Sequence, residues 1–388
     1  MRVLLVGEYS GVHTNLAKGL KAQGHEVYVI GDTDGYKKIG SPDLFIFKKR
    51  LYSRFRAINL LLTLYYILLD FLGIKGLFYS ITKISEIKKI KNYDVVQLIN
   101  TKPFSSISSF GNLLLLYFLF KQNNKIFLCG LGDDYAWVKS CLQKNPKYSK
   151  FDRYNLKKTR YFLWSFLYIY GIGFKILDRY VIKKSSKIIP GLYDYFLAYQ
   201  FTDFKEKVTE ILPLPIENLE KKAIPFKFNQ YPIKIFHGWQ VGREIDKGSD
   251  LLDEAIQILM KEYPTKVEYQ IVSGVSYDEY IRRFNESVIY IDQCYSLDKG
   301  MNAILGMRAG KIVLSGFERE VAEYFNIHNS DCLVNALPDK VSIFKELEKL
   351  ILNPELMEKI SVEAISFVEK HHSLEIVTQE YIKIWSEN

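Results

Sequence analysis

The sequence predicts two doubly wound α/β domains joined by a linker, and three observations lead to this expectation. Short apolar runs alternate with helical patterns along nearly all of the 388 residues, as they do when helices connect parallel strands. One proline-rich interval, residues 213–232, interrupts the alternation and is the expected linker. The charge changes sign there: residues 1–210 carry 33 Lys and Arg against 16 Asp and Glu, a net +17, whereas residues 211–388 carry 20 against 28, a net −8.

The first domain is expected over residues 1–212 and opens with a strand, a glycine loop, a helix and a second strand. The apolar run Arg2–Val6 ends at Gly7, and a helical pattern follows Gly11 and stops at Gly24. The same alternation continues, with further strands at Glu26–Ile30, Asp94–Ile99, Lys125–Cys129 and Lys187–Ile189 and helices near Phe104–Lys121 and over Tyr154–Lys184. This order is typical of a parallel sheet covered by helices.

The second domain is expected over residues 233–370, followed by a terminal helix at 371–388 that could pack back on the first domain. Its strands are predicted at Ile233–His237, Lys266–Val272, Val288–Ile291 and Lys311–Leu314. In two such domains facing across a cleft, ligands bind at the carboxyl ends of the strands.

Composition excludes several classes of protein. With 48% hydrophobic and 25% charged residues, the chain is neither a disordered tail nor a disulfide-stapled mini-protein. The four cysteines, Cys129, Cys141, Cys294 and Cys332, show no paired spacing, which favours a reduced, cytoplasmic compartment and no zinc site. Met1–Val6 reads as a strand rather than a leader, and the apolar stretches Leu60–Leu69 and Leu113–Phe120 are shorter than the roughly 20 residues that span a bilayer.

A segment between residues 47 and 91 has the pattern of a helix that lies on a membrane. An apolar helix is expected after five cations, Lys48, Lys49, Arg50, Arg54 and Arg56. We expect Phe55, Leu60, Leu61 and Tyr65 to enter the headgroup layer of an anionic membrane. A core helix with a basic cap is the alternative. We expect a peripheral protein on the inner face of a membrane, with no nucleic-acid partner.

Residues 242–248 suit a diphosphate cradle. Arg243 and Lys247 are four residues apart, follow the first strand of the second domain and lie at the start of a helix, where free backbone N–H groups attract anions. Gly300, Met301 and Asn302 open another helix and could direct amides into the same cleft. Solvent-exposed loops are the alternative.

These residues resemble the retaining GT-B glycosyltransferases of family 4. The resemblance rests on the glycine loop, on Gly24-His25-Glu26-Val27, on Gly242-Arg243 with Lys247-Gly248, and on residues 300–311. It implies that Arg243 and Lys247 hold the donor diphosphate, that the amides of Gly300, Met301 and Asn302 touch its distal phosphate, and that no metal or other cofactor is used.

The sequence departs from that family at two glutamates. Leu297 and Leu305 occupy the positions where the family binds the donor sugar and the ribose, and neither side chain can accept a hydrogen bond. Asp298 and Asn302 are possible substitutes, the latter one helical turn before Leu305.

Other polar residues at expected strand ends complete the candidate site. Asp292 could read the donor or cap a strand, and His237 is expected to be a positioned loop histidine. In the first domain, Gly11 and His13 could let a sugar diphosphate approach the backbone. Asp133 is the candidate contact for the acceptor hydroxyl, with helix capping as its alternative.

Two further patterns point elsewhere. Asp32-Thr33-Asp34 has the form of a metal-binding D-x-D, and Asp32 follows Gly11 at a distance suited to a dinucleotide ribose, but the loop before it is not G-x-G-x-x-G. The sequence therefore favours transfer of a hexose, with retention, from a nucleotide diphosphate sugar to a glycan or lipid-linked acceptor in bacterial surface polysaccharide synthesis. A non-catalytic GT-B relative that binds nucleotides or glycans is the alternative, and an NAD-dependent enzyme or a nucleotide-sugar epimerase is the weaker one.

Overall fold

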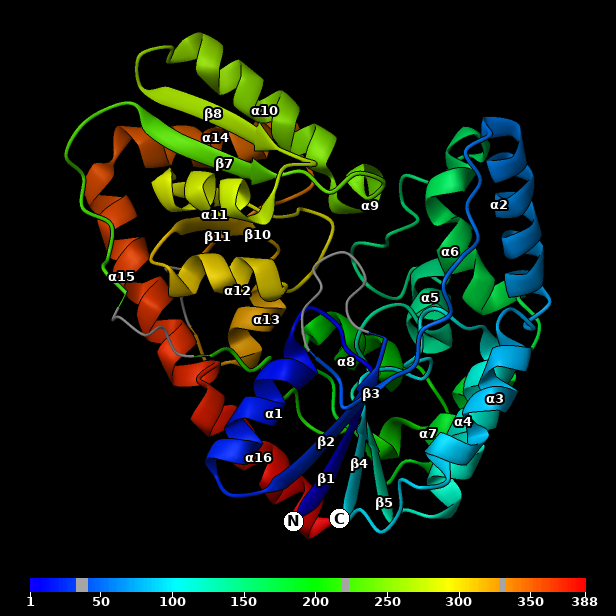
Figure 1. The fold of residues 1–388 in the computed structure, drawn as a ribbon. Coiled ribbons are helices and arrows are strands. Elements are labelled where there is room, and N and C mark those ends of the chain that lie inside the picture. The colour runs from blue at the N-terminus through cyan, green and yellow to red at the C-terminus, as the bar shows by residue number, and fades with distance from the viewer. Residues whose placement is uncertain (33–40, 218–222, 328–331) are drawn as a thin grey trace. The chain divides into compact units, whose positions relative to one another are not determined.

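The computed structural model describes residues 1–32, 41–217, 223–327 and 332–388, which form two compact units (Figure 1). Unit 1 consists of Met1–Gln143, Phe162–Pro215 and Leu374–Asn388, and unit 2 of Lys144–Tyr161 and Ile216–Ser373. Two segments thus belong to the unit that is distant in sequence. Residues 144–161 were expected in the first domain but cluster with unit 2, and the C-terminal helix α16 (Leu374–Glu387) clusters with unit 1.

Unit 1 is built on a parallel sheet of six strands in the order β3-β2-β1-β4-β5-β6. The strands are β1 (Arg2–Val6), β2 (Glu26–Gly31), β3 (Leu44–Phe45), β4 (Val95–Leu98), β5 (Lys125–Leu128) and β6 (Lys187–Ile188). Its helices are α1 (Val12–Ala22), α2 (Arg56–Phe71), α3 (Leu77–Ile87), α4 (Ser109–Lys121), α5 (Tyr135–Leu142), α6 (Thr159–Tyr170, whose first turn clusters with unit 2), α7 (Phe174–Lys184), α8 (Tyr193–Gln200) and α16.

The sheet of unit 1 is buried on both faces, as expected for largely apolar parallel strands. Val3 and Leu5 of β1 pack against α1 and α16, whereas Leu4 and Val6 pack against α4 and α7 on the other face (Figure 1). Gly7 ends β1 with φ +83°, where an added Cβ would lie 2.5 Å from Ile99 Cγ2. A residue with a side chain could not make this turn without displacing its neighbours.

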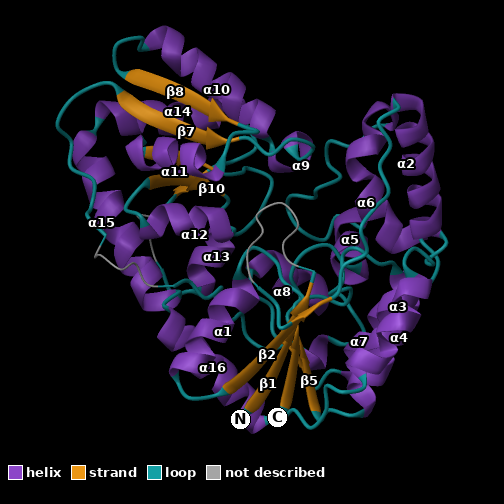
Figure 2. Ribbon diagram, in the orientation of Figure 1, coloured by secondary structure: helices purple, strands orange, loops and turns teal. Residues whose placement is uncertain are grey.

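Unit 2 contains a parallel sheet of five strands in the order β11-β10-β9-β7-β8 (Figure 2). The strands are β7 (Ile233–Gly238), β8 (Val267–Val272), β9 (Ile289–Ile291), β10 (Ile312–Ser315) and β11 (Val334–Asn335). The helices are α9 (Glu244–Lys247), α10 (Ser249–Glu262), α11 (Tyr277–Glu286), α12 (Met301–Arg308), α13 (Arg319–Tyr324), α14 (Lys340–Leu352) and α15 (Pro354–His371). Ile233 and Ile235 of β7 pack with α10 and α14, and Phe236 packs with Tyr290 and with Phe284 of α11.

The α/β fold class with two parallel sheets is as the sequence predicts, but three local features differ. The expected helix over 154–184 is interrupted by Gly171 and Gly173 and becomes the short 3₁₀ turn Leu156–Lys158, α6 and α7. The edge strands β3 and β11 have two residues each and give no period-two pattern to read. In the expected linker, Phe226 and Phe228 pack on the core of unit 2.

Within the described part of the chain, no helix combines the length and hydropathy that crossing a bilayer requires. All four cysteines are buried thiols.

Candidate functional site

Three neighbouring strands of unit 2 end side by side and bring candidate residues together. Parallel pairing aligns His237 of β7 with Ile291 of β9, and Ile291 with Leu314 of β10. Asp292 follows Ile291 directly, and Ser315 follows Leu314. Three polar side chains, those of His237, Asp292 and Ser315, therefore lie at one edge of the sheet, where ligands of such folds bind.

Lys247 and Asp292 form a buried ion pair at this edge. Their Nζ and Oδ1 atoms are 3.0 Å apart, with side chains 9% and 2% exposed, and Ser315 Oγ donates to Asp292 Oδ2 over 3.2 Å. Lys247 is held in place through its backbone, since its carbonyl accepts from Cys294 N at 2.9 Å. Gly248 follows with φ +72°, and a Cβ there would lie 2.3 Å from Cys294 Sγ. The glycine thus lets the loop approach β9 closely enough for the pair to form.

The N-terminus of α12 adjoins the same carboxylate. An added Cβ on Gly300 would lie 3.9 Å from both Asp292 Oδ2 and Gln293 Nε2. Gly300 precedes Met301 and Asn302 in the first turn of the helix, whose first intrahelical bond is from Ile304 N to Gly300 O at 3.1 Å. The amides before Ile304 have no carbonyl acceptor within the helix, and the helix dipole is positive there. A lysine ammonium and a helix N-terminus therefore flank Asp292, an arrangement that suits a diphosphate.

His237 contributes a neutral imidazole to this cluster. Burial, followed by the charge of Lys247, lowers the pKa of His237 to about 3. Its Nδ1 lies 2.8 Å from the hydroxyl of Tyr269, which is itself hydrogen-bonded to Asp253. Because the carboxylate accepts the tyrosine proton, we assign Nδ1–H as the donor to Tyr269 Oη, which leaves Nε2 as an acceptor. Nε2 is buried and has no hydrogen-bond partner among the residues that the structure describes.

Arg243, the other predicted cation, differs from Lys247 in its surroundings. Its side chain is 50% exposed, and its guanidinium contacts Asp246 at 2.8 Å. The structure thus joins His237, Lys247, Asp292 and Gly300 in one cluster and gives Arg243 a partner in its own turn.

Asp298 makes an ion pair within an aromatic cage. Its Oδ1 accepts from the backbone N and from Nζ of Lys299, at 2.7 and 3.1 Å. The Lys299 ammonium also lies over three phenylalanine rings, at 4.8 to 4.9 Å from the centroids of Phe317, Phe325 and Phe367. Since both side chains are 1% exposed, Asp298 neutralises a buried cation. Leu297, at the position of the first family glutamate, is also buried.

Two residues beside this site were not foreseen from the sequence. Arg153 makes a bidentate contact with Asp250 at 2.6 and 2.5 Å and lies over the ring of Tyr295, next to Cys294. Lys147 contacts the buried Glu318 at 2.6 Å. Both belong to residues 144–161, and the 97 residues between Arg153 and Asp250 leave no local pattern that would reveal the pair.

In unit 1, the glycine loop is occupied by a carboxylate of the protein itself. Glu8 accepts from Gly11 N at 2.9 Å, from Thr14 N at 2.8 Å and from Thr14 Oγ1 at 2.6 Å, and so caps α1. His13 is buried, with Nδ1 2.8 Å from Gly7 O, and burial lowers its pKa to about 4. Gly11 and His13 thus make structural contacts, and their part in donor binding stays a prediction.

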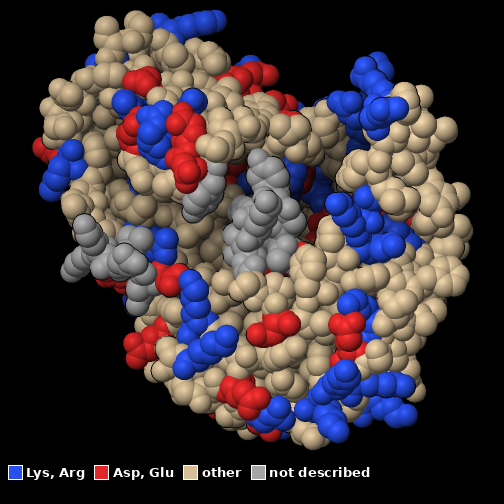
Figure 3. Space-filling model, in the orientation of Figure 1, with Lys and Arg blue, Asp and Glu red and all other residues tan. Residues whose placement is uncertain are grey.

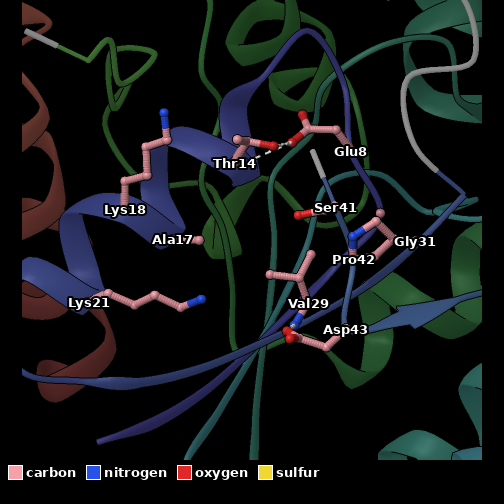
Figure 4. Close-up of a pocket in the computed structure, with 11 residues that line it drawn as sticks. Glu8, Thr14, Ala17, Lys18, Lys21, Val29, Gly31, Ser41, Pro42 and Asp43 are labelled. Atoms are coloured by element: carbon pink, nitrogen blue, oxygen red, sulfur yellow. Dashed lines mark hydrogen bonds between the residues drawn. The ribbon is translucent and has the colours of Figure 1, made fainter. Parts of the chain in front are cut away.

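A pocket of about 170 Å³ lies beside this loop, along α1 (Figure 4). Lys18 and Lys21 extend from α1 along it, and Glu8 and Asp43 belong to its wall. Asp32, at the end of β2, is buried and accepts from Ser105 Oγ and Ser106 N at 2.9 and 2.8 Å. Thr33 and Asp34, the rest of the D-x-D pattern, lie outside the described residues.

The two aspartates after β5 have different roles. Asp134 caps α5 by accepting from Trp137 N at 2.7 Å, and it also accepts from the hydroxyl of Tyr199 at 2.6 Å. Burial raises the pKa of Asp134 to about 6. Asp133 accepts from Ser165 Oγ at 2.6 Å. The capping role considered for Asp133 therefore belongs to its neighbour.

The basic segment and α2 have the exposure expected of a surface element. In α2 only Asp70 is buried, paired with Lys75 at 2.5 Å. Phe55, Leu60, Leu61 and Tyr65 are 54% to 66% exposed. Lys and Arg side chains gather along the segment that leads into α2, whereas the surface of α2 itself is mostly uncharged (Figure 3). Among the five predicted cations, Arg50 lies over the rings of Tyr66 and Trp164, which fixes it to the unit.

The sequence matches no protein-family model and no curated protein. Solved structures are nevertheless similar over the whole chain. Sucrose-phosphate synthase from Thermosynechococcus elongatus is 11% identical, with a TM-score of 0.59 and coverage of 100% of this chain and 98% of that one. HepE from Anabaena, in complex with UDP and glucose, is 9% identical, with a TM-score of 0.57 and full coverage of both chains.

A third similar structure is an enzyme of another class. The UDP-GlcNAc 2-epimerase from Neisseria meningitidis, bound to UDP-GlcNAc, is 13% identical, with a TM-score of 0.51 and full coverage of both chains. These likenesses confirm the GT-B fold class. Because the fold accommodates both transferases and an epimerase, the activity has to be argued from the site.

Proposed function

We propose that this chain is a glycosyltransferase whose donor is a nucleoside diphosphate sugar bound by unit 2. The observation that carries the proposal is the buried Lys247–Asp292 pair, with nitrogen and oxygen 3.0 Å apart, at three strand ends and beside the first turn of α12. An incoming diphosphate can replace Asp292 as the ion-pair partner of Lys247, while the Asp292 carboxylate keeps its hydrogen bond from Ser315. HepE and the epimerase, whose structures hold UDP or a UDP-sugar, share the fold and support this choice of ligand.

The chemistry follows from where negative charge develops. As the glycosidic bond to the diphosphate breaks, charge accumulates on the departing oxygen and on the distal phosphate. Lys247 and the amides of Gly300, Met301 and Asn302 would stabilise it, and Arg243 would add a second cation from its exposed turn. Such preorganised electrostatic stabilisation is often the largest contribution to catalysis and here would need no metal.

His237 and Asn302 are our candidates for recognising the donor. Within the described ranges of the chain, the acceptor nitrogen Nε2 of His237 lacks a hydrogen-bond partner, so a ligand hydroxyl could donate to it. Asn302 lies in the first turn of α12, beside the amides proposed for the phosphate. Asp298, engaged with Lys299, would act on the donor only through the fold.

The acceptor is proposed to be a glycan or a lipid-linked glycan of the bacterial surface. In unit 1, Asp133 is the proposed contact for its hydroxyl, and the acceptor oxygen would attack on the face that the diphosphate leaves, with retention. α2 and its basic segment would attach the protein to an anionic membrane, since each cation near such a surface contributes about 1 kcal/mol.

The function is tested by titrating the protein with UDP and UDP-sugars in a calorimeter and by following each sugar by NMR, with and without glycan or lipid-linked acceptors. Transfer that requires an acceptor, and a loss of UDP affinity in Lys247→Met, would support a glycosyltransferase. Epimerisation of UDP-GlcNAc without acceptor would identify the rival activity, and binding without turnover of any sugar would identify a non-catalytic relative.

Membrane attachment is tested separately, by co-sedimentation with phosphatidylglycerol vesicles at low and high salt. Replacement of Lys48, Lys49, Arg54 and Arg56 with Gln should reduce binding at low salt. Arg50 is kept because its ring contacts hold the segment in place. High salt should also weaken binding, because the attraction between surface charges is screened beyond about 10 Å at 0.1 M salt. Binding that changes neither with salt nor in the variant would refute the attachment.

A further inference from the structure

Helix α4 is apolar on two opposite faces, although only one of them meets the sheet. Leu115, Leu116 and Leu119 belong to the core of unit 1. A second stripe, with spacing i, i+3, i+4 and i+7, is formed by Phe110, Leu113, Leu114 and Tyr117. These four are partly buried or exposed, and Tyr117 is 48% exposed. Leu113 also packs against the core of unit 1, whereas Tyr117 leaves the stripe partly open to solvent.

The second stripe forms one wall of an apolar groove. The groove has a volume of about 450 Å³, and its other walls are Leu77 of α3 and Ile176 and Tyr180 of α7. Volumes of about 300–1,000 Å³ are typical of ligand sites in proteins. None of the lining residues carries a formal charge, so the groove suits a hydrocarbon.

Close backbone contacts fix the groove in shape. Phe110 lies between two glycines with positive φ: a Cβ at Gly73 would be 2.9 Å from its ring and one at Gly173 would be 3.0 Å from it. Phe110 N also donates to Gly73 O at 3.0 Å. On the far wall, Tyr180 stacks on Phe120 with ring centroids 5.9 Å apart. A preformed site of this kind loses little conformational entropy on binding.

Exposed apolar residues lie where the end of α2 meets the segment before α7. Ile172 N donates to Phe71 O at 2.7 Å, which connects the end of α2 to the start of α7. The residues around this connection are exposed: Ile172 is 53%, Ile74 is 40% and Phe78, next to Leu77, is 85% exposed. Large exposed apolar patches mark interaction sites.

The basic residues around the groove favour an anionic occupant. The exposed charged residues of α7 are all basic, namely Lys175, Arg179, Lys183 and Lys184, and Lys88, Lys89 and Lys91 follow α3. A second copy of the chain would bring like charges together, whereas an anionic headgroup would be attracted. We propose that the groove between α3, α4 and α7 holds one acyl chain of an anionic phospholipid drawn from the membrane. The inference extends the membrane attachment proposed above and is independent of donor binding.

Photocrosslinking tests this directly with the full chain. The protein is mixed with vesicles of phosphatidylglycerol that carries a diazirine within the acyl chain, and the mixture is irradiated. The labelled peptides are then mapped by mass spectrometry. We expect label on the lining residues of α3, α4 and α7. Ile176→Trp should reduce that label at least fivefold by filling the groove, and because Ile176 is 58% exposed the core stays intact. Ile81→Trp, at a 49% exposed position of α3 outside the groove, is the matched control and should keep the label.

Several outcomes would overturn the proposal. Label confined to α2, equal losses in both variants, or equal labelling from phosphatidylcholine vesicles would each do so. Sedimentation velocity without lipid provides a further check, since a dimer that Ile176→Trp dissociates would identify a second copy as the occupant. UDP titration of the same samples separates the two proposals: a protein that labels in the groove but binds no UDP refutes only the proposed transferase.

Discussion

Replacing Lys247 with Met should separate the two roles of the buried pair. Asp292, with its side chain 2% exposed, would keep only the hydroxyl of Ser315 as a hydrogen-bonding partner among the contacts described above. Breaking a buried ion pair from one side costs about 3–5 kcal/mol of stability. Losing a hydrogen bond to a charged group costs about 1.5–3 kcal/mol of binding, which corresponds to a roughly 10- to 150-fold weaker affinity for UDP.

The double variant Lys247→Met with Asp292→Asn is the matched control. It removes both charges, so urea denaturation should show that it recovers much of the lost stability, whereas calorimetry should show that UDP affinity stays low. A single variant that binds UDP within twofold of the wild type would refute the cradle. A double variant as unstable as the single one would refute the account of Asp292 as an uncompensated charge.

Three further changes have defined expectations. Asp298→Asn should destabilise the protein by about 3–5 kcal/mol in urea denaturation, because it leaves the charge of Lys299 uncompensated. Adding Lys299→Met should restore part of the lost stability. A single variant as stable as the wild type would contradict the pairing. Gly248→Ala should lower the stability by more than the about 1–3 kcal/mol of a strained backbone alone, because its Cβ meets Cys294. Gly274→Ala, with φ +66° and nothing within 4 Å, should show only the backbone strain. Equal melting temperatures of the two variants would refute the steric argument. His237 has a folded pKa of about 3, below its unfolded value of about 6.5, so its stabilisation is complete above pH 6.5 and lost as the pH falls towards 3. Relative to His237→Asn, the wild type should lose up to about 1.4 kcal/mol per pH unit below 6, and parallel pH profiles would contradict this.

The sequence predicts the fold well where the period of the apolar pattern is clear. The strands β1 and β10 read as apolar runs next to Gly7 and Gly310. The predicted positions agree with the structure to within one residue at β1 and β4. The pattern fails where an element is too short to repeat, as in β3 and β11. It also fails where glycines cut an aromatic stretch into separate helices.

Within the site, local spacing and long-range contacts differ in what they reveal. Lys247 and Gly300 stand in recognisable turns, so they could be singled out from the sequence. The role of Asp298 depends on Phe317, Phe325 and Phe367, which approach Lys299 only through the tertiary fold. Glu8 caps α1 from within the glycine loop, three residues before the N-cap Gly11, a position that the usual capping patterns do not include.

The return of α16 to unit 1 sets the order in which the two units can be completed during synthesis. Trp385 donates to Gln97 at 3.0 Å, and Tyr381 and Trp385 cover the sheet face formed by Val3 and Leu5. No described residue after Ser373 belongs to unit 2, so unit 2 can close before α16 has left the ribosome. Unit 1 therefore buries the sheet face under α16 only after unit 2 can close, although β1 is made before unit 2. Until then that apolar sheet face is available to chaperones.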